Sequence, residues 1–235
     1  NADHKFYSEL GRYSRDKKII VAGCLSQVSG AEMMKRAPFI HAVIGPQYIY
    51  EIPSIIRGDK VVLTDYNPKF YNQHSPLSKG SVSASINIMY GCSRFCSYCI
   101  VPYSRGREIS RKPDDIYNEI SVFASNGVKE ITLLGQNVNA YNYDNTNFQK
   151  LLKNIDRISR ISRIRFISPH PSSMTDDQIS TIADLPKCVP HIHLPLQSGS
   201  DRILKLMRRG YSASDYMKKV EKIEKQIKDA ILTTD

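Results

Sequence analysis

Strand-like and helix-like segments alternate from about residue 84, and this alternation constrains the fold more than any other feature of the chain. Pro113 followed by Asp114 and Asp115 predicts the start of one helix, and Gly127 predicts its end. Alternating strands and helices form parallel sheets, so the sequence predicts an α/β fold with a barrel or partial barrel. The predicted strands cover residues 86–89, 130–134, 163–167, 191–194 and 230–233.

The segment before residue 75 predicts a smaller α/β unit. Apolar runs at 19–22 and 42–44 predict two buried parallel strands, with helices at 29–36 and 47–57. A polar stretch with prolines and a glycine follows, and it predicts a linker. The predicted domain boundaries are 1–75 for the small unit, 76–83 for the linker and 84–235 for the barrel.

Three cysteines lie in one short loop directly after the strand predicted at 86–89. Cys92, Cys96 and Cys99 have C-x3-C-x2-C spacing, and three thiolates on a tight loop can hold three corners of a cubane iron–sulfur cluster. The fourth iron is then open to a ligand. Structural zinc sites and ferredoxin clusters take four protein ligands, and a disulfide framework needs an oxidising compartment. The open cluster is favoured, with a zinc-bound or metal-free loop as the alternative.

Composition and charge narrow the function classes. The chain is 41% hydrophobic and 24% charged, as in an ordinary globular protein. No apolar run approaches the ~20 residues of a membrane span and no signal peptide opens the chain, so we expect a cytoplasmic protein without membrane contact. The five cysteines then indicate thiols used as ligands in a reducing compartment. A net charge of +10 suits a polyanionic partner such as RNA.

Basic and aromatic residues interleave in and after the cysteine loop, with one acid, Glu108, among them. Cations and rings beside a reaction centre suit recognition of splayed, single-stranded bases, and a solvated basic loop is the alternative. The residues concerned are Arg94, Phe95, Tyr98, Tyr103, Arg105, Arg107, Arg111 and Lys112.

Polar residues also follow later predicted strands. Gly135 lets the backbone approach a ligand closely, and Gln136 offers a donor and an acceptor. His170 lies between two prolines and either lines the site or is a structural histidine. Gln197 and Ser198 are placed to meet a ligand from the end of the fourth predicted strand.

The segment after Ser198 predicts another helix. Ser200 or Asp201 is expected to cap it. Arg208 and Arg209 follow the helix, and they either pair with a carboxylate or phosphate or interact favourably with the helix dipole.

The cysteine spacing, with Tyr98 just before the last cysteine, resembles the motif of the radical S-adenosylmethionine (SAM) superfamily. The resemblance implies that Cys92, Cys96 and Cys99 hold a [4Fe–4S] cluster whose open iron chelates SAM. One electron then cleaves SAM to a 5′-deoxyadenosyl radical. By position, Gly135 and Gln136 inherit contact with the amino group of SAM, and the other cofactor-binding candidates are Gln197 and Ser198.

Several segments together resemble one branch of that superfamily, the methylthiotransferases. Two of them, 134–141 and 168–171, are most similar to the bacterial enzymes that methylthiolate carbon 2 of isopentenyladenosine next to the tRNA anticodon. The other matching segments are 23–27, 35–38, 43–45, 99–108 and 193–202.

This resemblance implies a second, auxiliary cluster in the intact enzyme. Cys24 matches one of its three ligands, and the other two would precede residue 1. One SAM would donate a methyl group to sulfur at that cluster, and the radical from another would abstract hydrogen from the adenine. The chain begins without Met in a helical pattern and ends in a strand-like run. We therefore expect a truncated fragment that lacks the last barrel strand and the RNA-binding module and is inactive alone.

The resemblance also implies partners, namely a tRNA anticodon stem-loop and an electron donor such as a flavodoxin, and we expect a monomer. Cys188 matches neither cluster motif and is interpreted as a structural thiol. Three alternatives stay open. The first is a methylthiotransferase acting on a ribosomal-protein aspartate or on threonylcarbamoyl-adenosine. The others are a non-catalytic iron–sulfur RNA-binding protein and a zinc-stabilised binding module.

Overall fold

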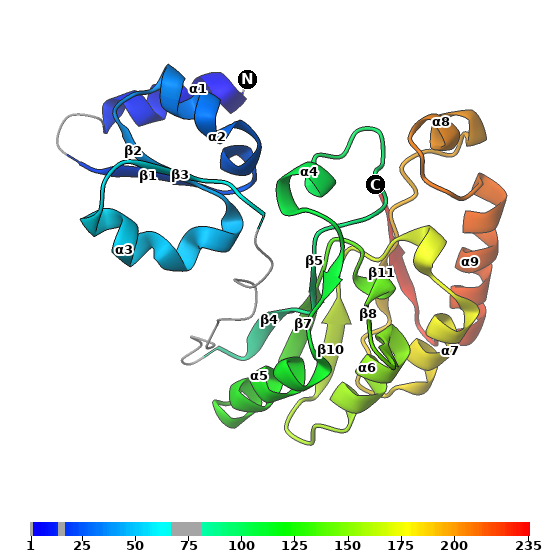
Figure 1. Ribbon diagram of the computed structural model, residues 1–235. Coiled ribbons are helices and arrows are strands. Elements are labelled where there is room, and N and C mark those ends of the chain that lie inside the picture. Colours follow the sequence, from blue (N-terminus) through cyan, green and yellow to red (C-terminus); the bar gives the residue numbers. More distant parts are fainter. Residues whose placement is uncertain (1, 14–16, 67–80) are drawn as a thin grey trace. The chain divides into compact units, whose positions relative to one another are not determined.

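The computed structural model describes residues 2–13, 17–66 and 81–235, with side chains from residue 5 onward (Figure 1). The chain divides into two compact units. The first comprises residues 1–73 and 100–106, and the second comprises 74–99 and 107–235. Most of the linker predicted at 76–83 lies outside the described residues, and its last residue, Ser83, already belongs to a strand.

The first unit contains a three-stranded parallel sheet in the order β1-β2-β3. The central strand, β2, is buried along its whole length, as expected for a parallel strand covered on both faces. Its one polar residue, His41, is paired, since its Nε2 lies 3.0 Å from the carbonyl oxygen of Ile55. The elements of this unit are α1 (Ala2–Arg12), β1 (Ile19–Ala22), α2 (Cys24–Arg36), β2 (Ile40–Ile44), η1 (Pro46–Glu51), α3 (Ile52–Arg57), β3 (Val61–Leu63) and α4 (Val101–Arg105).

Helices cover both faces of this sheet (Figure 1). Residues of α1 and α2 enclose one apolar cluster around Met33 and Val43, and η1 and α3 enclose another around Ile44 and Ile55. Both predicted strands are confirmed. The helix predicted at 29–36 begins earlier, at Cys24, and the one predicted at 47–57 is divided into a 3-10 helix and an α-helix with a proline at its start.

The second unit is built on parallel strands with helices between them. Strands β10, β7 and β4 form one parallel sheet in that order, and β11 pairs with β12 in another. Its elements are β4 (Ser83–Asn87), β5 (Met89–Tyr90), β6 (Ile109–Ser110), α5 (Pro113–Ser125), β7 (Glu130–Leu134), η3 (Val138–Ala140), β8 (Asn142–Tyr143), β9 (Thr146–Asn147), α6 (Phe148–Asp156), β10 (Arg163–Phe166), η4 (Pro171–Ser173), α7 (Asp176–Asp184), β11 (His191–His193), α8 (Asp201–Leu206), α9 (Ala213–Gln226) and β12 (Ile231–Thr233).

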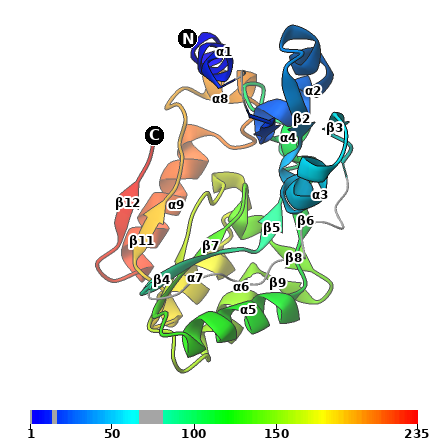
Figure 2. The ribbon, with the colours of Figure 1, turned by 90° about the vertical axis from the view of Figure 1, so that its left-hand side faces the viewer.

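Each predicted strand of this unit coincides with an observed one, although their ends differ. The first is interrupted at Ile88, where the chain leaves β7 and pairs next with β6 in the antiparallel sense. A single bridge between Ile164 and Cys188 extends the edge of β10. The described strands therefore form an α/β fold with parallel sheets that does not close into a barrel (Figure 2).

Helices α5, α6, α7 and α9 pack on these strands and form the largest apolar core of the described chain. In α5, Ile116, Ile120 and Phe123 are buried on one face, and Gly127, with φ 96°, follows its end as predicted. None of the described helices is both long and apolar enough to cross a bilayer.

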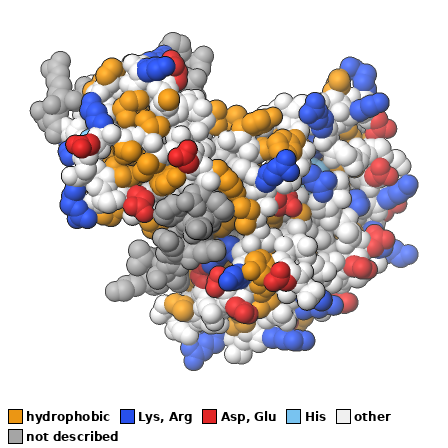
Figure 3. Space-filling view, viewed as in Figure 1, with side chains coloured by type: hydrophobic (Ala, Val, Ile, Leu, Met, Phe, Trp, Pro, Cys, Tyr) orange, Lys and Arg blue, Asp and Glu red, His pale blue; other side chains and the backbone are white. Residues whose placement is uncertain are grey.

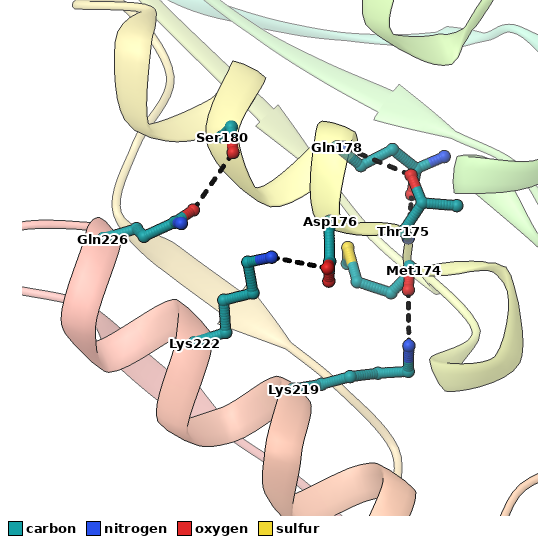
Figure 4. Close-up of polar contacts among 8 residues, drawn as sticks. All are labelled: Met174, Thr175, Asp176, Gln178, Ser180, Lys219, Lys222 and Gln226. Atoms are coloured by element: carbon teal, nitrogen blue, oxygen red, sulfur yellow. Dashed lines mark hydrogen bonds and ion pairs between the residues drawn. The ribbon is translucent and has the colours of Figure 1, made fainter.

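Polar contacts fasten α9 to α7 (Figure 4). Lys219 Nζ donates to the carbonyl oxygen of Met174 at 2.6 Å, and Lys222 Nζ pairs with Asp176 Oδ2 at 2.5 Å. Farther along, Ser180 Oγ donates to Gln226 Oε1 at 3.2 Å. These contacts, with the buried residues Tyr216 and Ile223, hold α9, which begins directly after residues 208–212.

Candidate metal centre

The cysteine loop follows β5 and turns sharply. Gly91 and Phe95 have φ values of 69° and 49°, in the left-handed region. Cys92 and Cys96 are buried and Cys99 is partly exposed, and all three are free thiols. The amide of Cys99 donates to the carbonyl oxygen of Cys96 at 3.0 Å. A short local turn therefore carries all three predicted metal ligands.

The three thiols influence one another electrostatically. Burial raises the pKa of Cys92, the backbone N–H of Arg94 lowers it, and the negative charges of Glu108, Cys96 and Cys99 raise it further. Three thiolates in this loop therefore repel one another. A bound cationic metal would relieve that repulsion and favour the deprotonated thiols.

The arrangement of possible ligand side chains bears on whether a single metal ion or a cluster could bind here. Within 2–13, 17–66 and 81–235, no three His, Cys, Asp or Glu side chains meet closely enough to hold a single metal ion. A single zinc ion needs all its ligands within about 2.3 Å of one centre, whereas a cubane spreads its ligands over several irons. Three thiols are the ligand number of a cubane with one open iron, whereas a structural zinc ion would need a fourth ligand.

Arg209 is distant in sequence from the cysteine loop but contacts it. It is 5% exposed, and its Nη1 lies 3.5 Å from Cys96 Sγ and 3.4 Å from Tyr98 Oη. The adjacent Arg208 adopts φ 57° and is exposed. The sequence did not separate these two arginines, and the structure places only Arg209 beside the thiols.

Arg94 lies within the same loop, and His170 lies near it. Arg94 Nη2 donates to Ser173 Oγ at 2.5 Å. His170 is buried, and its Nδ1 accepts from the amide of Ser172 at 3.2 Å, which leaves the proton of the neutral ring on Nε2. Burial, followed by the charges of Arg209 and Arg94, lowers the pKa of His170 to about 3. Nε2 has no hydrogen-bond partner in the described part of the chain, so a buried neutral donor is available here.

A buried amide network holds His170 in place, and the sequence did not reveal it. Asn139 Oδ1 accepts from the amide of His170 at 2.8 Å, and Asn139 Nδ2 donates to its carbonyl oxygen at 3.3 Å. Gln178 Nε2 in turn donates to the carbonyl oxygen of Asn139 at 2.7 Å. The only sequence signal is the capping box of Thr175 and Gln178 at the start of α7.

Gly135 and Gln136 follow β7 as predicted. Packing against neighbouring residues also explains why position 135 is a glycine. A Cβ on Gly135 would lie 2.6 Å from Met89 Cγ and 3.1 Å from Val138 Cα. Gln136 Oε1 and Asn137 Oδ1 are buried without a partner among the described residues. Unpaired buried amide oxygens are unusual, and they indicate a polar surface able to receive hydrogen-bond donors.

Gln197 and Ser198 are partly exposed at the end of β11. Gln197 adopts φ 71°, and its Nε2 donates to Asp235 Oδ1 at 2.9 Å. Ser198 Oγ accepts from the amide of Ser200 at 3.2 Å. In the part of the chain that the structure describes, neither side chain hydrogen-bonds to the cysteine loop.

The predicted side-chain cap of α8 is wrong. Ser200 occupies the cap position, but its side chain makes no capping hydrogen bond. The carboxylate of Asp201 accepts instead from the amide of Ala213 at 2.7 Å, so it is used at the start of α9.

The basic segment does not form one continuous cationic surface. Arg111 is buried, pairs with Glu119 at 2.7 Å and donates to the carbonyl oxygen of Asn87 at 2.6 Å, so it is structural. Arg105 lies in α4 of the first unit, and the guanidinium of Arg107 lies 5.9 Å from the ring centre of Phe95. On the face drawn in Figure 3, basic and acidic side chains are interspersed over the second unit.

The other two cysteines have different surroundings. Cys24 is partly exposed at the start of α2 in the first unit. Cys188 lies in the core of the second unit, and burial, with a smaller effect of Asp156, raises its pKa to about 12. A thiol that stays protonated in the core is consistent with the structural role predicted for Cys188.

A parallel α/β unit with three thiols on the loop after β5 indicates a class of protein. The Radical SAM superfamily matches residues 86–235, and the chain belongs to this superfamily.

More specific similarity extends over the whole chain. A tRNA-2-methylthio-N(6)-dimethylallyladenosine synthase of Thermodesulfovibrio yellowstonii is 44% identical over 100% of this chain and 56% of its own length. The protein of the same name from Syntrophus aciditrophicus is also 44% identical, over 100% of this chain and 54% of its own. The chain thus spans about half the length of the curated relatives it matches.

Solved structures share the fold at low identity. The cobalamin-dependent S-adenosylmethionine radical enzyme OxsB superposes with a TM-score of 0.66 and 12% identity, over 98% of this chain and 38% of that one. The radical S-adenosylmethionine methyltransferase TsrM from Kitasatospora setae gives a TM-score of 0.53 and 17% identity, over 71% of this chain and 31% of its own.

Proposed function

We propose that the protein is a tRNA-modifying radical SAM methylthiotransferase that converts isopentenyladenosine next to the anticodon into its 2-methylthio derivative. The observation that carries this proposal is the three-thiol loop. It lies in a chain whose whole length aligns with about half the length of the tRNA-2-methylthio-N(6)-dimethylallyladenosine synthases. The target carbon supports a radical route, because an unactivated aromatic C–H offers no useful acid or leaving group for polar catalysis.

In this proposal Cys92, Cys96 and Cys99 hold a [4Fe–4S] cluster. When bound, the cluster supplies the one-electron chemistry that cleaves SAM reductively. Gly135, Gln136, Gln197 and Ser198 are the proposed SAM-contacting residues. The unpaired Oε1 of Gln136 is suited to accept from an ammonium group.

The surrounding residues provide a cationic environment. Arg209 and Arg94 place positive charge near the loop, and buried His170 keeps its single ring proton on Nε2 at neutral pH. A neutral donor influenced by two nearby cations can hydrogen-bond an anionic or carbonyl oxygen without changing its own protonation state. These side chains bind and orient, and none of them needs to exchange a proton.

The remaining features belong to the whole protein. We propose an auxiliary cluster with Cys24 as one ligand, a tRNA anticodon stem-loop as substrate, and a one-electron donor such as a flavodoxin. We also propose that 84–235 forms a partial (β/α) barrel, preceded by the domain 1–75 and the linker 76–83. The protein is proposed to act as a cytoplasmic monomer.

Anaerobic reconstitution with iron and sulfide, followed by EPR of the reduced protein with and without SAM, tests the cluster assignment. We expect a [4Fe–4S] signal whose shape changes when SAM binds. A signal indifferent to SAM would point to a non-catalytic iron–sulfur protein, and zinc without iron would point to a binding module.

The substrate needs a separate assay with the full-length protein. Isopentenylated tRNA, threonylcarbamoyl-adenosine tRNA and the ribosomal-protein aspartate substrate are compared under the same conditions. Methylthiolation of the first substrate alone supports the proposal, and a preference for either of the others overturns the substrate assignment.

A further inference from the structure

Arg209 is a buried cation without a carboxylate partner. None of the ion pairs in the described part of the chain involves it, although it is only 5% exposed. Its hydrogen bonds go to neutral oxygens and to a single sulfur, Cys96 Sγ at 3.5 Å. Burying an unpaired charge is costly, so a residue of this kind calls for an anion nearby.

The orientation of the guanidinium is fixed from several sides. Nε donates to Tyr211 Oη at 3.2 Å and Nη2 donates to the carbonyl oxygen of Pro195 at 3.3 Å. Tyr211 is itself held, because its hydroxyl donates to the carbonyl oxygen of Leu196 at 2.6 Å. The planar fork therefore presents Nη1 to Cys96 in one defined geometry.

A cluster bound by the three thiols would supply the negative charge that buried Arg209 lacks nearby. Three thiolates give a [4Fe–4S] group a net negative charge, and that charge grows by one when the cluster is reduced. Hydrogen bonds to the ligand sulfurs and nearby charge are two of the factors that set the reduction potential of such a cluster.

We propose that Arg209 is a positioning residue that raises the reduction potential of the cluster at Cys92, Cys96 and Cys99, through its hydrogen bond to Cys96 Sγ and its buried charge. This inference rests on the proposed function, because it presupposes that cluster. One electron passes from a low-potential donor, dithionite in the test below, to the cluster. No proton moves with it, since the guanidinium stays protonated in both states.

The chain offers a matched control at the next position. Arg208 carries the same charge on the same turn, but it is exposed. An effect of net charge alone would be shared by both arginines, whereas an effect of the hydrogen bond and of buried charge would be confined to Arg209.

The experiment is an EPR-monitored redox titration of the reconstituted protein. It is done in a Cys24→Ala background, so that only the cluster at Cys92, Cys96 and Cys99 contributes. For Arg209→Gln we expect the equilibrium constant for reduction by dithionite to fall about tenfold, which is ~59 mV for a one-electron couple. Arg209→Lys should recover part of the loss, and Arg208→Gln should change the constant less than about twofold. An Arg209→Gln value equal to that of Arg208→Gln overturns the proposal.

A second measurement needs no variant and covers the case in which Arg209→Gln does not assemble a cluster. The unaltered protein is labelled with [15N]arginine, and pulsed EPR of the reduced cluster is recorded. We expect a hyperfine coupling from one arginine nitrogen, and its absence would overturn the proposal. If the unaltered protein takes up no iron and sulfide, the proposed function itself fails, which is a distinct result.

Discussion

The two cysteine-bearing turns of the molecule follow strands of similar parallel α/β units, yet they are held in different ways. Cys24 begins α2 directly after Gly23, whose amide donates to the carbonyl oxygen of Ile44 on the neighbouring strand at 3.3 Å. Within the same unit, Gln47 Nε2 donates a hydrogen bond of 2.9 Å to Gln27 Oε1, on the first turn of α2. This turn is fastened by backbone and amide groups of its own small unit.

The loop that carries Cys92, Cys96 and Cys99 is fastened by side chains from far along the chain. Arg94 reaches Ser173, 79 positions away, and Arg209 reaches Cys96 over a separation of 113. These two hydrogen bonds fix the loop to Ser173 and place the positive charge of Arg209 beside Cys96. The three-thiol loop is therefore held by contacts over long sequence separations within its unit, whereas Cys24 lies on a locally held turn.

The largest expected effects come from replacing a cysteine in each turn, and the two replacements should impair different steps. Cys96→Ala should reduce SAM cleavage to background, because two thiols cannot hold the cluster, and 5′-deoxyadenosine is measured by chromatography. In full-length protein, Cys24→Ala should abolish methylthiolation while SAM cleavage continues. Cys188→Ala is the control for loss of a cysteine and should retain both. Deoxyadenosine production by Cys96→Ala would contradict the assignment of the loop.

The next effect compares one glycine of each unit, Gly135 directly after β7 and Gly45 directly after β2. Gly135→Ala should lower the free energy of unfolding by up to about 3 kcal/mol, because its Cβ would press on Met89 Cγ at 2.6 Å and on the Val138 backbone at 3.1 Å. Gly45→Ala should cost less, about 1 kcal/mol, since the three atoms nearest to its Cβ are amide ends of Gln27 and Gln47, which can turn away from the methyl group at the cost of the hydrogen bond that they share.

Urea unfolding of both glycine variants measures the difference. Equal costs would contradict the expectation that Gly135 is the more tightly constrained of the two glycines.

A pH effect should be confined to the second unit. His170 has a folded pKa of about 3, below the ~6.5 of an unfolded histidine, so the unfolded chain binds more protons between these values. The stability that neutral His170 provides is therefore present above pH 6.5 and is lost as the pH falls toward 3. Between pH 6.5 and 4.5 we expect a loss of about 2 kcal/mol in the free energy of unfolding.

Urea unfolding of His170→Asn at the two pH values tests this effect. Asn keeps an acceptor for the amide of Ser172 and should remove most of this pH dependence. His191→Asn, which changes an exposed histidine, is the control. An unchanged pH dependence in His170→Asn would show that another group is responsible.

The smallest effect concerns a single anchor of the three-thiol loop. Ser173→Ala removes the acceptor for Arg94 and should cost about 1 kcal/mol. Faster amide hydrogen exchange at residues 92–99, measured before reconstitution, reports the loosened loop. Ser97→Ala, which removes an exposed hydroxyl from the same loop, should leave the exchange unchanged. Equal exchange in the two variants would mean that Arg94 does not anchor the loop.

Local patterns predicted most of the elements correctly. The apolar runs placed the strands of both units, and Pro113 with Gly127 bounded α5. The patterns did not predict the partner change at Ile88, because the hydrogen bonds that cause it come from β7 and β6. They also grouped Arg111 with an RNA-binding basic segment, whereas in the tertiary structure Arg111 is buried and paired with Glu119.

The spacing of the thiols and the alternation of strands and helices were determined by the sequence alone, because both are set by residues close together in the chain. Which of two adjacent arginines reaches Cys96, and which ring nitrogen of His170 is left unpaired, were decided only by the tertiary structure. These outcomes depend on contacts between residues that can be more than 100 positions apart, as for Arg209 and Cys96. No local periodicity specifies which such residues meet, since chain folding alone brings them together.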